Sequence, residues 1–216
     1  MRALIFTGGK GPDIEEVRYL LGSYSSVVAA DSGIYAAEAA GIVPDIIVGD
    51  MDSLHDRTIL KKYPQDSIQQ WPKDKDFTDT ELALHLLREK GFDDIILIGG
   101  NGGRIDHFLA IRSLFDNAIP PSVWIGDESA VFSVGKGCVR QNICIRNLQP
   151  EDTISFFPTG TNPHLCKSSG VYWPIDELAW DAGKFSLSNR CKSGVCSFEA
   201  LAGGFIVITP ITVHID

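Results

Sequence analysis

The stretch TDTELALHLLREKGFDDIILIGG, residues 78–100, predicts a helix that is followed closely by a buried strand. Leucine and alanine recur four residues apart in its first half, a spacing that keeps one face of a helix apolar. Thr78 and Glu81 have the spacing of a capping box, and Gly91 is typical of a helix end. We therefore expect a helix over residues 79–90, and a strand after it that ends in paired glycines.

Short runs rich in β-branched and other apolar residues recur through the first part of the chain and alternate with helical stretches. The runs are Ala3 to Thr7, Val27 to Ala30, Ile46 to Val48, Ser67 to Gln70, Ile95 to Ile98 and Val123 to Ile125. Such alternation is typical of α/β proteins. We expect residues 1–135 to form an α/β domain with a mainly parallel sheet and flanking helices.

The pattern changes after residue 135. Apolar residues there alternate with a period of two, as at Val139, Ile143 and Ile145, among frequent Gly, Pro, Ser and Asn. Helical spacing is absent from this part of the sequence. The pattern predicts that residues 136–216 form a small antiparallel β-sandwich domain.

Composition excludes several classes of function. The chain has 216 residues, is 44% hydrophobic and carries a formal net charge of −9, which disfavours a nucleic-acid partner because phosphate backbones are held by surplus Lys and Arg. Its apolar runs are far shorter than the roughly 20 residues of a membrane-spanning helix. The N-terminal run is too short for a signal peptide, so we expect a cytoplasmic protein. Five cysteines without zinc-site spacing indicate free thiols in a reducing compartment.

Four of the predicted strands lead into loops that carry Asp, Gly or both. The loops are residues 29–33, 48–53, 71–79 and 99–107. In open α/β sheets the ligand site lies at the carboxyl ends of the strands, so these loops should converge. A single Asp in such a loop is typical of a turn or a helix cap. Four acidic or glycine-rich loops together favour a binding site.

Converging carboxylates repel one another and call for a cation, and Mg²⁺ prefers oxygen ligands. Asp50 and Asp52 lie two residues apart, and in an extended segment they would face the same way. The glycine loop of residues 99–103, followed by Arg104, suits a phosphate. Neither the dinucleotide-binding pattern G-x-G-x-x-G nor the P-loop pattern G-x-x-x-x-G-K-[ST] occurs in the chain.

Taken in order, the loops resemble the thiamine pyrophosphokinase family. The motifs are A-D-S-G at residues 30–33, P-D-x-x-x-G-D-x-D-S at 44–53, D-x-D-x-T-D at 74–79, G-G-x-G-G-R-x-D-H at 99–107 and, more weakly, F-S-L-S-N at 185–189. The resemblance implies a nucleotide-binding catalytic domain followed by a thiamine-binding β-sandwich. It also implies a homodimer in which thiamine lies between the first domain of one subunit and the second domain of the other.

The implied activity is transfer of the pyrophosphoryl group of ATP to thiamine, which gives thiamine diphosphate and AMP with Mg²⁺ as cofactor. The resemblance assigns the metal to Asp50, Asp52 and Asp76; ATP to Asp31, Gly99, Gly100, Gly102, Gly103 and Arg104; catalysis to Asp79, Asp106 and Arg104; and thiamine to Ser188 and Asn189. The general base is Asp79 or Asp106, and the sequence does not choose between them.

The chain departs from the family pattern in two places. Ile34 and Tyr35 stand where an Asn is frequent, and Arg190 stands where an acidic residue is frequent. Trp173 and Trp180 suit either stacking on a cationic ligand or packing in the β domain.

Two other functions use the same features. Another Mg²⁺-dependent phosphotransferase or a phosphohydrolase would need the same acidic site, and a simple kinase would release ADP instead of AMP. A non-catalytic nucleotide or thiamine sensor would bind without turnover.

Overall fold

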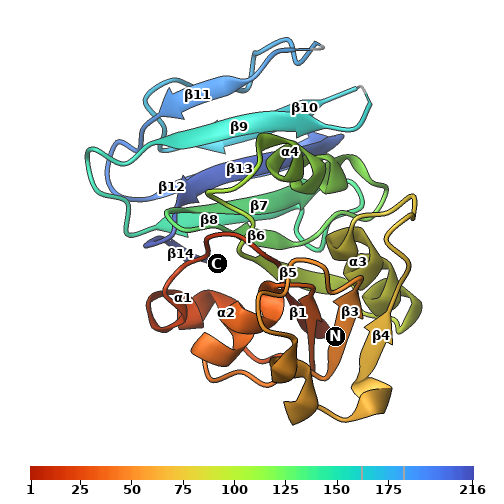
Figure 1. The fold of residues 1–216 in the computed structure, drawn as a ribbon. Helices are drawn as coiled ribbons and strands as arrows, with labels where there is room; N and C mark the ends of the chain where they lie inside the picture. Colours follow the sequence, from red (N-terminus) through yellow and green to blue (C-terminus); the bar gives the residue numbers. More distant parts are fainter. Residues whose placement is uncertain (162, 182) are drawn as a thin grey trace. The chain divides into compact units, whose positions relative to one another are not determined.

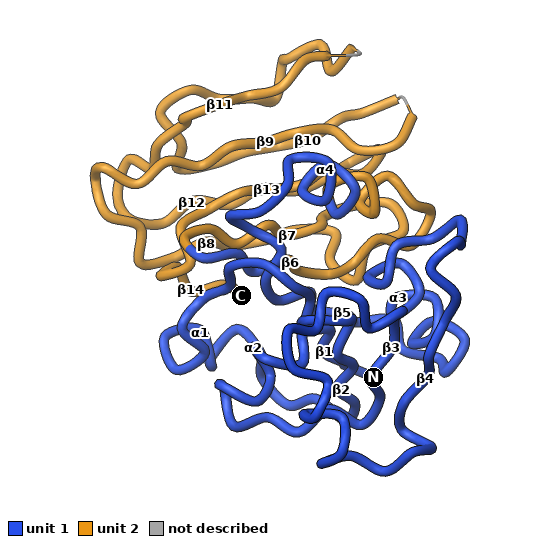
Figure 2. Tube along the Cα trace, viewed as in Figure 1, with its two compact units in different colours: residues 1–111, 125–127 blue, residues 112–124, 128–216 orange. Residues whose placement is uncertain are grey.

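The structure is a computed structural model that describes residues 1–161, 163–181 and 183–216. Contacts divide the chain into two compact units (Figure 2). Unit 1 comprises residues 1–111 and 125–127, and unit 2 comprises residues 112–124 and 128–216. The functional domains 1–135 and 136–216 stay a prediction, and residues 128–135 group with unit 2 by their contacts.

Unit 1 alternates strands and helices, as the sequence predicts (Figure 1). Its elements are β1 (Arg2–Phe6), α1 (Ile14–Leu21), β2 (Ser26–Ala30), α2 (Gly33–Ala39), β3 (Ile46–Gly49), the short 3-10 helices η1 (Arg57–Lys62) and η2 (Gln65–Ser67), β4 (Ile68–Gln70), α3 (Asp79–Glu89), β5 (Asp94–Ile98) and the start of α4 (Ile105–Ser113). The strands lie in the order β5-β1-β2-β3-β4, and each of these neighbouring pairs is parallel. Helices α2 and α3 pack on β1 and β2. The carboxyl ends of the parallel strands therefore share one edge of the sheet.

Helix α3 begins and ends as predicted. The backbone N–H of Glu81 donates to Thr78 Oγ1 at 3.2 Å, and the N–H of Thr78 donates to Glu81 Oε2 at 2.7 Å, so both halves of the capping box are formed. Gly91 follows the helix with φ +82°, a left-handed conformation that suits glycine. These local signals fix the first residue of the helix at Asp79.

Unit 2 is built from antiparallel strands. Its elements are η3 (Leu114–Asp116), β7 (Ser129–Gly135), β8 (Asn142–Arg146), β9 (Ile154–Thr159), β10 (Leu165–Ser169), β11 (Ser186–Asn189), β12 (Cys196–Ala202), β13 (Gly204–Pro210) and β14 (His214–Ile215), while β6 (Val123–Ile125) spans the division between the units. The strands run in the orders β11-β9-β13-β7 and β10-β12-β8-β14. A mainly parallel sheet is thus confirmed for unit 1 only, and the chain as a whole is a mixed α/β protein.

Aromatic side chains fill the space between the two sheets of unit 2. Phe156 of β9 stacks on Phe198 of β12 with ring centroids 5.3 Å apart, and Phe198 meets Phe205 of β13 edge-on at 5.1 Å. All three rings are buried. Trp180 is also buried and packs edge-on against Phe205, which makes it a core residue.

The strand alternation predicted at Val139 is wrong. Hydrogen bonds from Cys138 N to Gly135 O and from Gly135 N to Arg140 O close a turn between β7 and β8. Val139 lies in this turn with its side chain exposed. The alternation is correct for Ile143 and Ile145, which lie in β8 and are buried.

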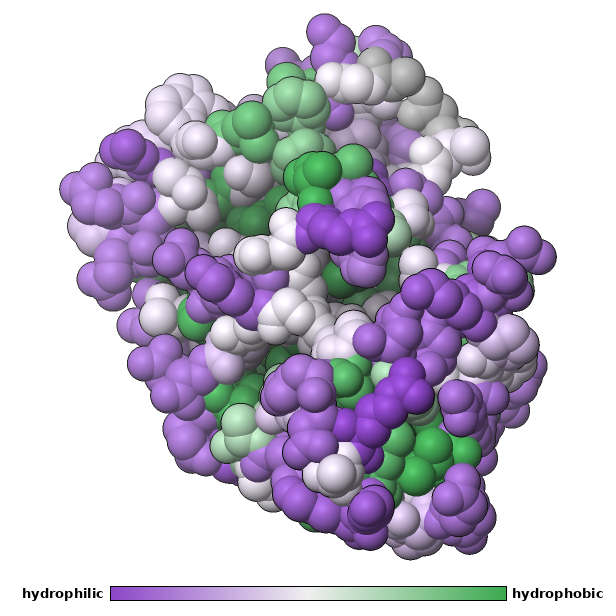
Figure 3. All heavy atoms as spheres, in the orientation of Figure 1, coloured by the Kyte–Doolittle hydropathy of each residue, from purple (hydrophilic) through white to green (hydrophobic). Residues whose placement is uncertain are grey.

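The surface and the thiols agree with the composition. All five cysteines are free, and three of them are buried. Over the described ranges, no helix is both long and apolar enough to cross a membrane. On the face drawn in Figure 3, hydrophilic residues predominate and hydrophobic residues gather in separate patches.

Thr78→Ala tests the local origin of α3. The variant loses the side-chain acceptor of the capping box, which should cost about 1 kcal/mol of unfolding free energy. In a chain of this size the melting temperature should fall by about 2–4 °C in a thermal unfolding experiment. Thr78→Ser keeps the hydroxyl and is the matched control, so an equal loss in both variants would contradict the capping role.

Candidate metal and phosphate site

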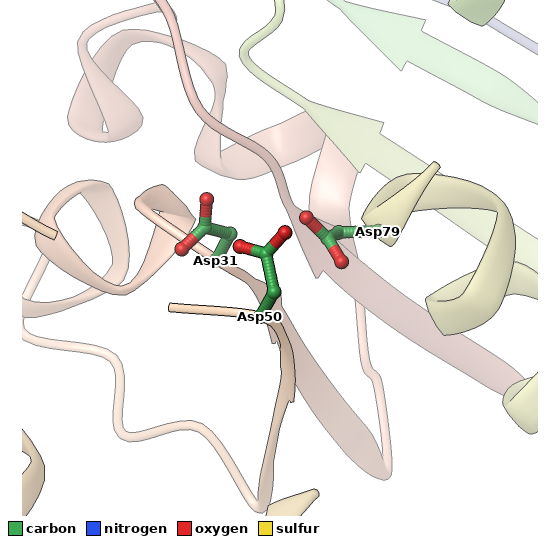
Figure 4. Close-up of side chains that lie close together, drawn as sticks. All are labelled: Asp31, Asp50 and Asp79. Carbon is green, nitrogen blue, oxygen red and sulfur yellow. The ribbon is translucent and has the colours of Figure 1, made fainter. Parts of the chain in front are cut away.

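Three carboxylates from separate segments of unit 1 face one another (Figure 4). Asp31 follows β2, Asp50 follows β3, and Asp79 is the first residue of α3. One oxygen of each carboxylate lies within 4.8 Å of one oxygen of each of the others. The predicted convergence is therefore present for the loops 29–33, 48–53 and 71–79, whereas no residue of the loop 99–107 belongs to this group.

Unusual backbone conformations bring these groups together. Asp31 and Met51 have φ values of +47° and +62°, in the left-handed region that non-glycine residues rarely adopt. Gly49 has φ +147°, and a Cβ at this position would lie 3.1 Å from Asp79 Cγ and 3.2 Å from Asp31 Cβ. Met51 is buried in the core beside Leu54, which holds the loop in place. Such strain is concentrated at functional sites in many proteins.

Burial and mutual repulsion disfavour the charged form of two of the carboxylates. Asp31 is 8% exposed, and its pKa is raised to about 6, first by burial and then by the charges of Asp79, Asp50 and Asp52. The pKa of Asp79 is also raised, chiefly by burial, against the opposing effect of Lys75. The hydroxyl of Ser53 donates a hydrogen bond to Asp31 Oδ2.

The cluster fits a divalent cation. Among the described residues, the buried atoms Asp31 Oδ1 and Asp79 Oδ1 have no hydrogen-bond donor. Lys75 Nζ lies 3.1 Å from Asp79 Oδ1 and forms an ion pair with it, which offsets part of the charge of Asp79. Mg²⁺ prefers oxygen ligands, and all the ligand atoms of this half-buried site are carboxylate oxygens. Buried oxygens without a hydrogen-bond donor need another partner. A bound cation would satisfy both atoms and offset the repulsion.

Asp52 and Asp76 lie outside this group of three. The expectation that Asp50 and Asp52 share an extended segment is wrong, because Met51 turns the chain and Asp50 Oδ1 accepts the N–H of Asp52 at 2.9 Å. Asp52 instead pairs with Lys73 at 2.6 Å, a contact that lowers the pKa of Asp52. Asp76 is exposed. The metal role of these two residues stays a prediction.

The glycine loop between β5 and α4 adopts backbone conformations that favour glycine. Gly99, Gly100 and Gly102 all have positive φ. The N–H groups of Gly99 and Gly100 donate to the carbonyls of Ile125 and Gly8, at 3.0 and 2.9 Å, so they shape the loop within the protein. The assignment of ATP to Gly99, Gly100, Gly102 and Gly103 stays a prediction.

A lysine that the sequence reasoning missed lies beside this loop. A Cβ built on Gly102 would be only 2.6 Å from Lys10 Cδ, so the lysine side chain crosses the loop at a glycine. Reciprocal backbone hydrogen bonds join Lys10 to Asn101. Lys10 is exposed, and it adds a positive charge where a phosphate would approach.

Arg104 and Asp106 form an exposed pair at the start of α4. Arg104 Nε donates to Asp106 Oδ1 at 3.1 Å, and a second hydrogen bond joins Arg104 Nη2 to Asp106 Oδ2. Arg104 lowers the pKa of Asp106. The pair orients the guanidinium and leaves it largely open to solvent, while Asp106 lies outside the three-carboxylate group.

In unit 2, Asn189 organises the loop that carries Trp173. Asn189 is buried, its Nδ2 donates to Trp173 O at 2.6 Å, and its Oδ1 accepts the N–H groups of Trp173 and Arg190. Ser188 is exposed with φ +54°. Trp173 is exposed as well, unlike Trp180. The thiamine contacts assigned to Ser188 and Asn189 stay a prediction, and the structure gives Asn189 a role in holding Trp173.

The departure at Ile34 and Tyr35 has a structural explanation. Ile34 is fully buried. The hydroxyl of Tyr35 donates to Asp56 O at 3.1 Å and accepts the N–H of Asp56 at 3.0 Å, and its ring stacks on His55. Tyr35 therefore ties α2 to the end of the loop that begins at Asp50.

Two further residues of the site were missed by the sequence reasoning. Lys75 contacts Asp50 and Asp79, and Ser53 contacts Asp31. Both lie inside the acidic motifs, and this position is the only signal that the sequence offers.

The sequence is similar to those of known proteins. Residues 17–118 match the family model described as thiamin pyrophosphokinase, catalytic domain. A thiamine pyrophosphokinase of Bacillus subtilis (strain 168) is 31% identical over 213 residues, which cover 94% of this chain and 96% of that protein.

Solved structures share the fold. A crystal structure of thiamine pyrophosphokinase from Bacillus subtilis aligns with a TM-score of 0.78 at 25% identity and covers 97% of this chain and 99% of its own. The crystal structure of yeast thiamin pyrophosphokinase aligns with a TM-score of 0.68 at 16% identity over 97% of this chain and 86% of its own, which shows the fold alone.

Asp31→Asn tests the electrostatic cost of the cluster in metal-free protein. The pKa of Asp31 in the fold, about 6, lies above its ordinary value of 3.8, so its contribution to stability is full below the ordinary value and is lost as pH rises through about 6. The amide carries no charge. In EDTA, Asp31→Asn should therefore melt at a higher temperature than the parent at about pH 7.5 and without that advantage near pH 3.5.

Asp52→Asn is the matched control for this experiment. Because Lys73 lowers the pKa of Asp52, removal of its charge should bring no gain at neutral pH. A gain for Asp31→Asn of the same size at both pH values would contradict the electrostatic explanation.

Proposed function

Because the chain belongs to the thiamine pyrophosphokinase family, we propose that it transfers the pyrophosphoryl group of ATP to the hydroxyl of thiamine, giving thiamine diphosphate and AMP. The observation that carries this proposal is similarity along almost the whole chain, including 96% of the length of the Bacillus subtilis enzyme. The carboxylate cluster at the sheet edge supports the chemistry, because transfer from a nucleoside triphosphate needs a divalent cation.

Asp31, Asp50 and Asp79 would hold Mg²⁺ in this proposal. When bound, Mg²⁺ neutralises charge on the phosphate oxygens and aligns the triphosphate. The protein contributes three carboxylates, which follow β2, follow β3 and begin α3, and two of them are buried enough to have raised pKa values. Asp50 suits a metal ligand better than Asp52 or Asp76, because only Asp50 faces Asp31 and Asp79.

Arg104 and Lys10 supply positive charge at the glycine loop. The planar guanidinium of Arg104, oriented by Asp106, can bind two phosphate oxygens at once.

The thiamine oxygen forms a bond to the β-phosphorus of ATP, and the bond from that phosphorus to the α–β bridging oxygen breaks. AMP leaves with the electron pair, and the hydroxyl proton passes to a carboxylate or to water. A net charge of −9 is compatible with this substrate, because the basic residues are local.

We propose that Ser188 and Trp173 contact thiamine, and that Asn189 holds the loop that carries Trp173 in place. Trp173 is 60% exposed, and an aromatic face attracts a flat cationic ligand.

We also propose that the protein forms a homodimer, as the family resemblance implies, and that it acts in the cytoplasm. Exposed apolar side chains of unit 2, Phe185 and Leu187, support a protein contact at this surface.

The products of the reaction test the proposal directly. Purified protein is incubated with ATP, Mg²⁺ and thiamine, and the phosphorus species are followed by NMR. We expect thiamine diphosphate and AMP to appear together and only when thiamine is present. ADP as the nucleotide product would indicate a simple kinase, and binding without turnover would indicate a sensor.

Asp50→Asn and Asp52→Asn compare a carboxylate of the three-residue cluster with one that lies outside it. Loss of a metal ligand removes several kcal/mol of charge stabilisation, so Asp50→Asn should lower the rate of AMP formation at saturating Mg²⁺ by about 100-fold or more. Asp52→Asn, of equal charge change, should lower it by less than about tenfold. Unchanged melting temperatures would show that both variants fold. An equal loss of rate in both would contradict the assignment of the metal to the three facing carboxylates.

A further inference from the structure

Lys75 lies among the carboxylates of the cluster. Its Nζ is 3.1 Å from Asp79 Oδ1 and 3.5 Å from Asp50 Oδ2. The lysine side chain is only 11% exposed, and the side chains of Asp50 and Asp79 are 13% and 20% exposed. The ammonium therefore stands between two of the three residues that would hold Mg²⁺.

A second lysine on the same loop gives a comparison. Lys73 pairs with Asp52 at 2.6 Å, but its side chain is 76% exposed and Asp52 is 44% exposed. Such a pair in water contributes little to stability. Lys75 differs because its charge and the charges of its partners are largely shielded from solvent, where removal of one partner leaves the others uncompensated.

The geometry of Lys75 does not complete the site. Asp31 Oδ1 and Asp79 Oδ1 lack a hydrogen-bond donor in the described part of the chain, although Lys75 lies within ion-pair distance of Asp79. The ammonium therefore offsets charge at Asp50 and Asp79 and leaves Asp31 Oδ1 without a donor among the described residues. A divalent cation would offset the charge of all three carboxylates, and it could not share the space between Asp50 and Asp79 with an ammonium group.

We propose that Lys75 is a built-in counter-ion that holds Asp50 and Asp79 together in the metal-free protein and is displaced when the divalent cation binds. Lysine suits this role, since its charge sits on a flexible stem that can move away and turn towards phosphate oxygens. The inference rests on the cation site of the proposed function. Lys75 is thus a positioning residue that competes with the metal.

Lys75→Met tests the proposal, with Lys73→Met as the matched control. Without its counter-ion the metal-free cluster should be less stable, so Lys75→Met in EDTA should melt at least about 3 °C below the parent. Mn²⁺ binding, measured without nucleotide by electron paramagnetic resonance, should be tighter by about tenfold or more, because a competing positive charge is gone. Lys73→Met should change neither quantity beyond about 1 °C or twofold.

The outcomes separate this inference from the proposed function. Mn²⁺ binding that is weaker in Lys75→Met than in the parent, or an unchanged melting temperature in EDTA, would overturn the counter-ion role and leave the cation site intact. Absence of Mn²⁺ binding in the parent and in both variants would overturn the cation site itself, and the inference with it.

A measurement on the parent protein avoids any failure of the variant to fold. The amines are acetylated briefly, and the extent of reaction at each lysine is read by mass spectrometry. In EDTA, Lys75 should react more slowly than Lys73, and saturating Mg²⁺ should raise the reactivity of Lys75 several-fold relative to Lys73. An unchanged or lower relative reactivity of Lys75 with Mg²⁺ would show that the cation does not displace it.

Discussion

The repulsion among Asp31, Asp50 and Asp79 is the constraint on which the site depends. Three carboxylates with oxygens within 4.8 Å of one another are unfavourable unless positive charge lies between them. The parallel sheet of unit 1 brings the carboxylates together, because the residues that follow its strands all lie at one edge. Their close approach also depends on the left-handed backbone at Asp31 and Met51 and on the glycine at position 49. The fold thus keeps three carboxylates close together at a cost in stability.

This constraint explains why an acidic protein suits an anionic substrate. The net charge of −9 does not decide the charge of the ligand, because basic side chains lie at the site itself. Lys75 lies inside the cluster, Lys10 crosses the glycine loop, and Arg104 is oriented by Asp106. The family membership of the chain implies transfer from a nucleoside triphosphate, and the carboxylate cluster suits that chemistry.

The parts predicted from sequence are those set by local interactions. Helix α3 could be predicted because Thr78, Glu81 and Gly91 act within a few residues of its ends. The convergence of the acidic loops followed from the strand order of an α/β sheet. The prediction that Asp50 and Asp52 face the same way was wrong, because Met51 between them adopts a left-handed conformation. Methionine has no preference for that conformation, so the sequence does not indicate it. The contact of Lys75 with Asp50 could not be predicted, because it joins two separate loops and is set by tertiary packing.

In the proposed site, Asp31, Asp50 and Asp79 together bind one divalent cation. The most direct measurement is crystallographic: crystals of the protein are grown with Mn²⁺, and an anomalous difference map is calculated. We expect a single strong peak within coordination distance of an oxygen from each of the three carboxylates. A peak at Asp52 or Asp76 without Asp31 and Asp79, or no peak in this region at saturating Mn²⁺, would contradict it.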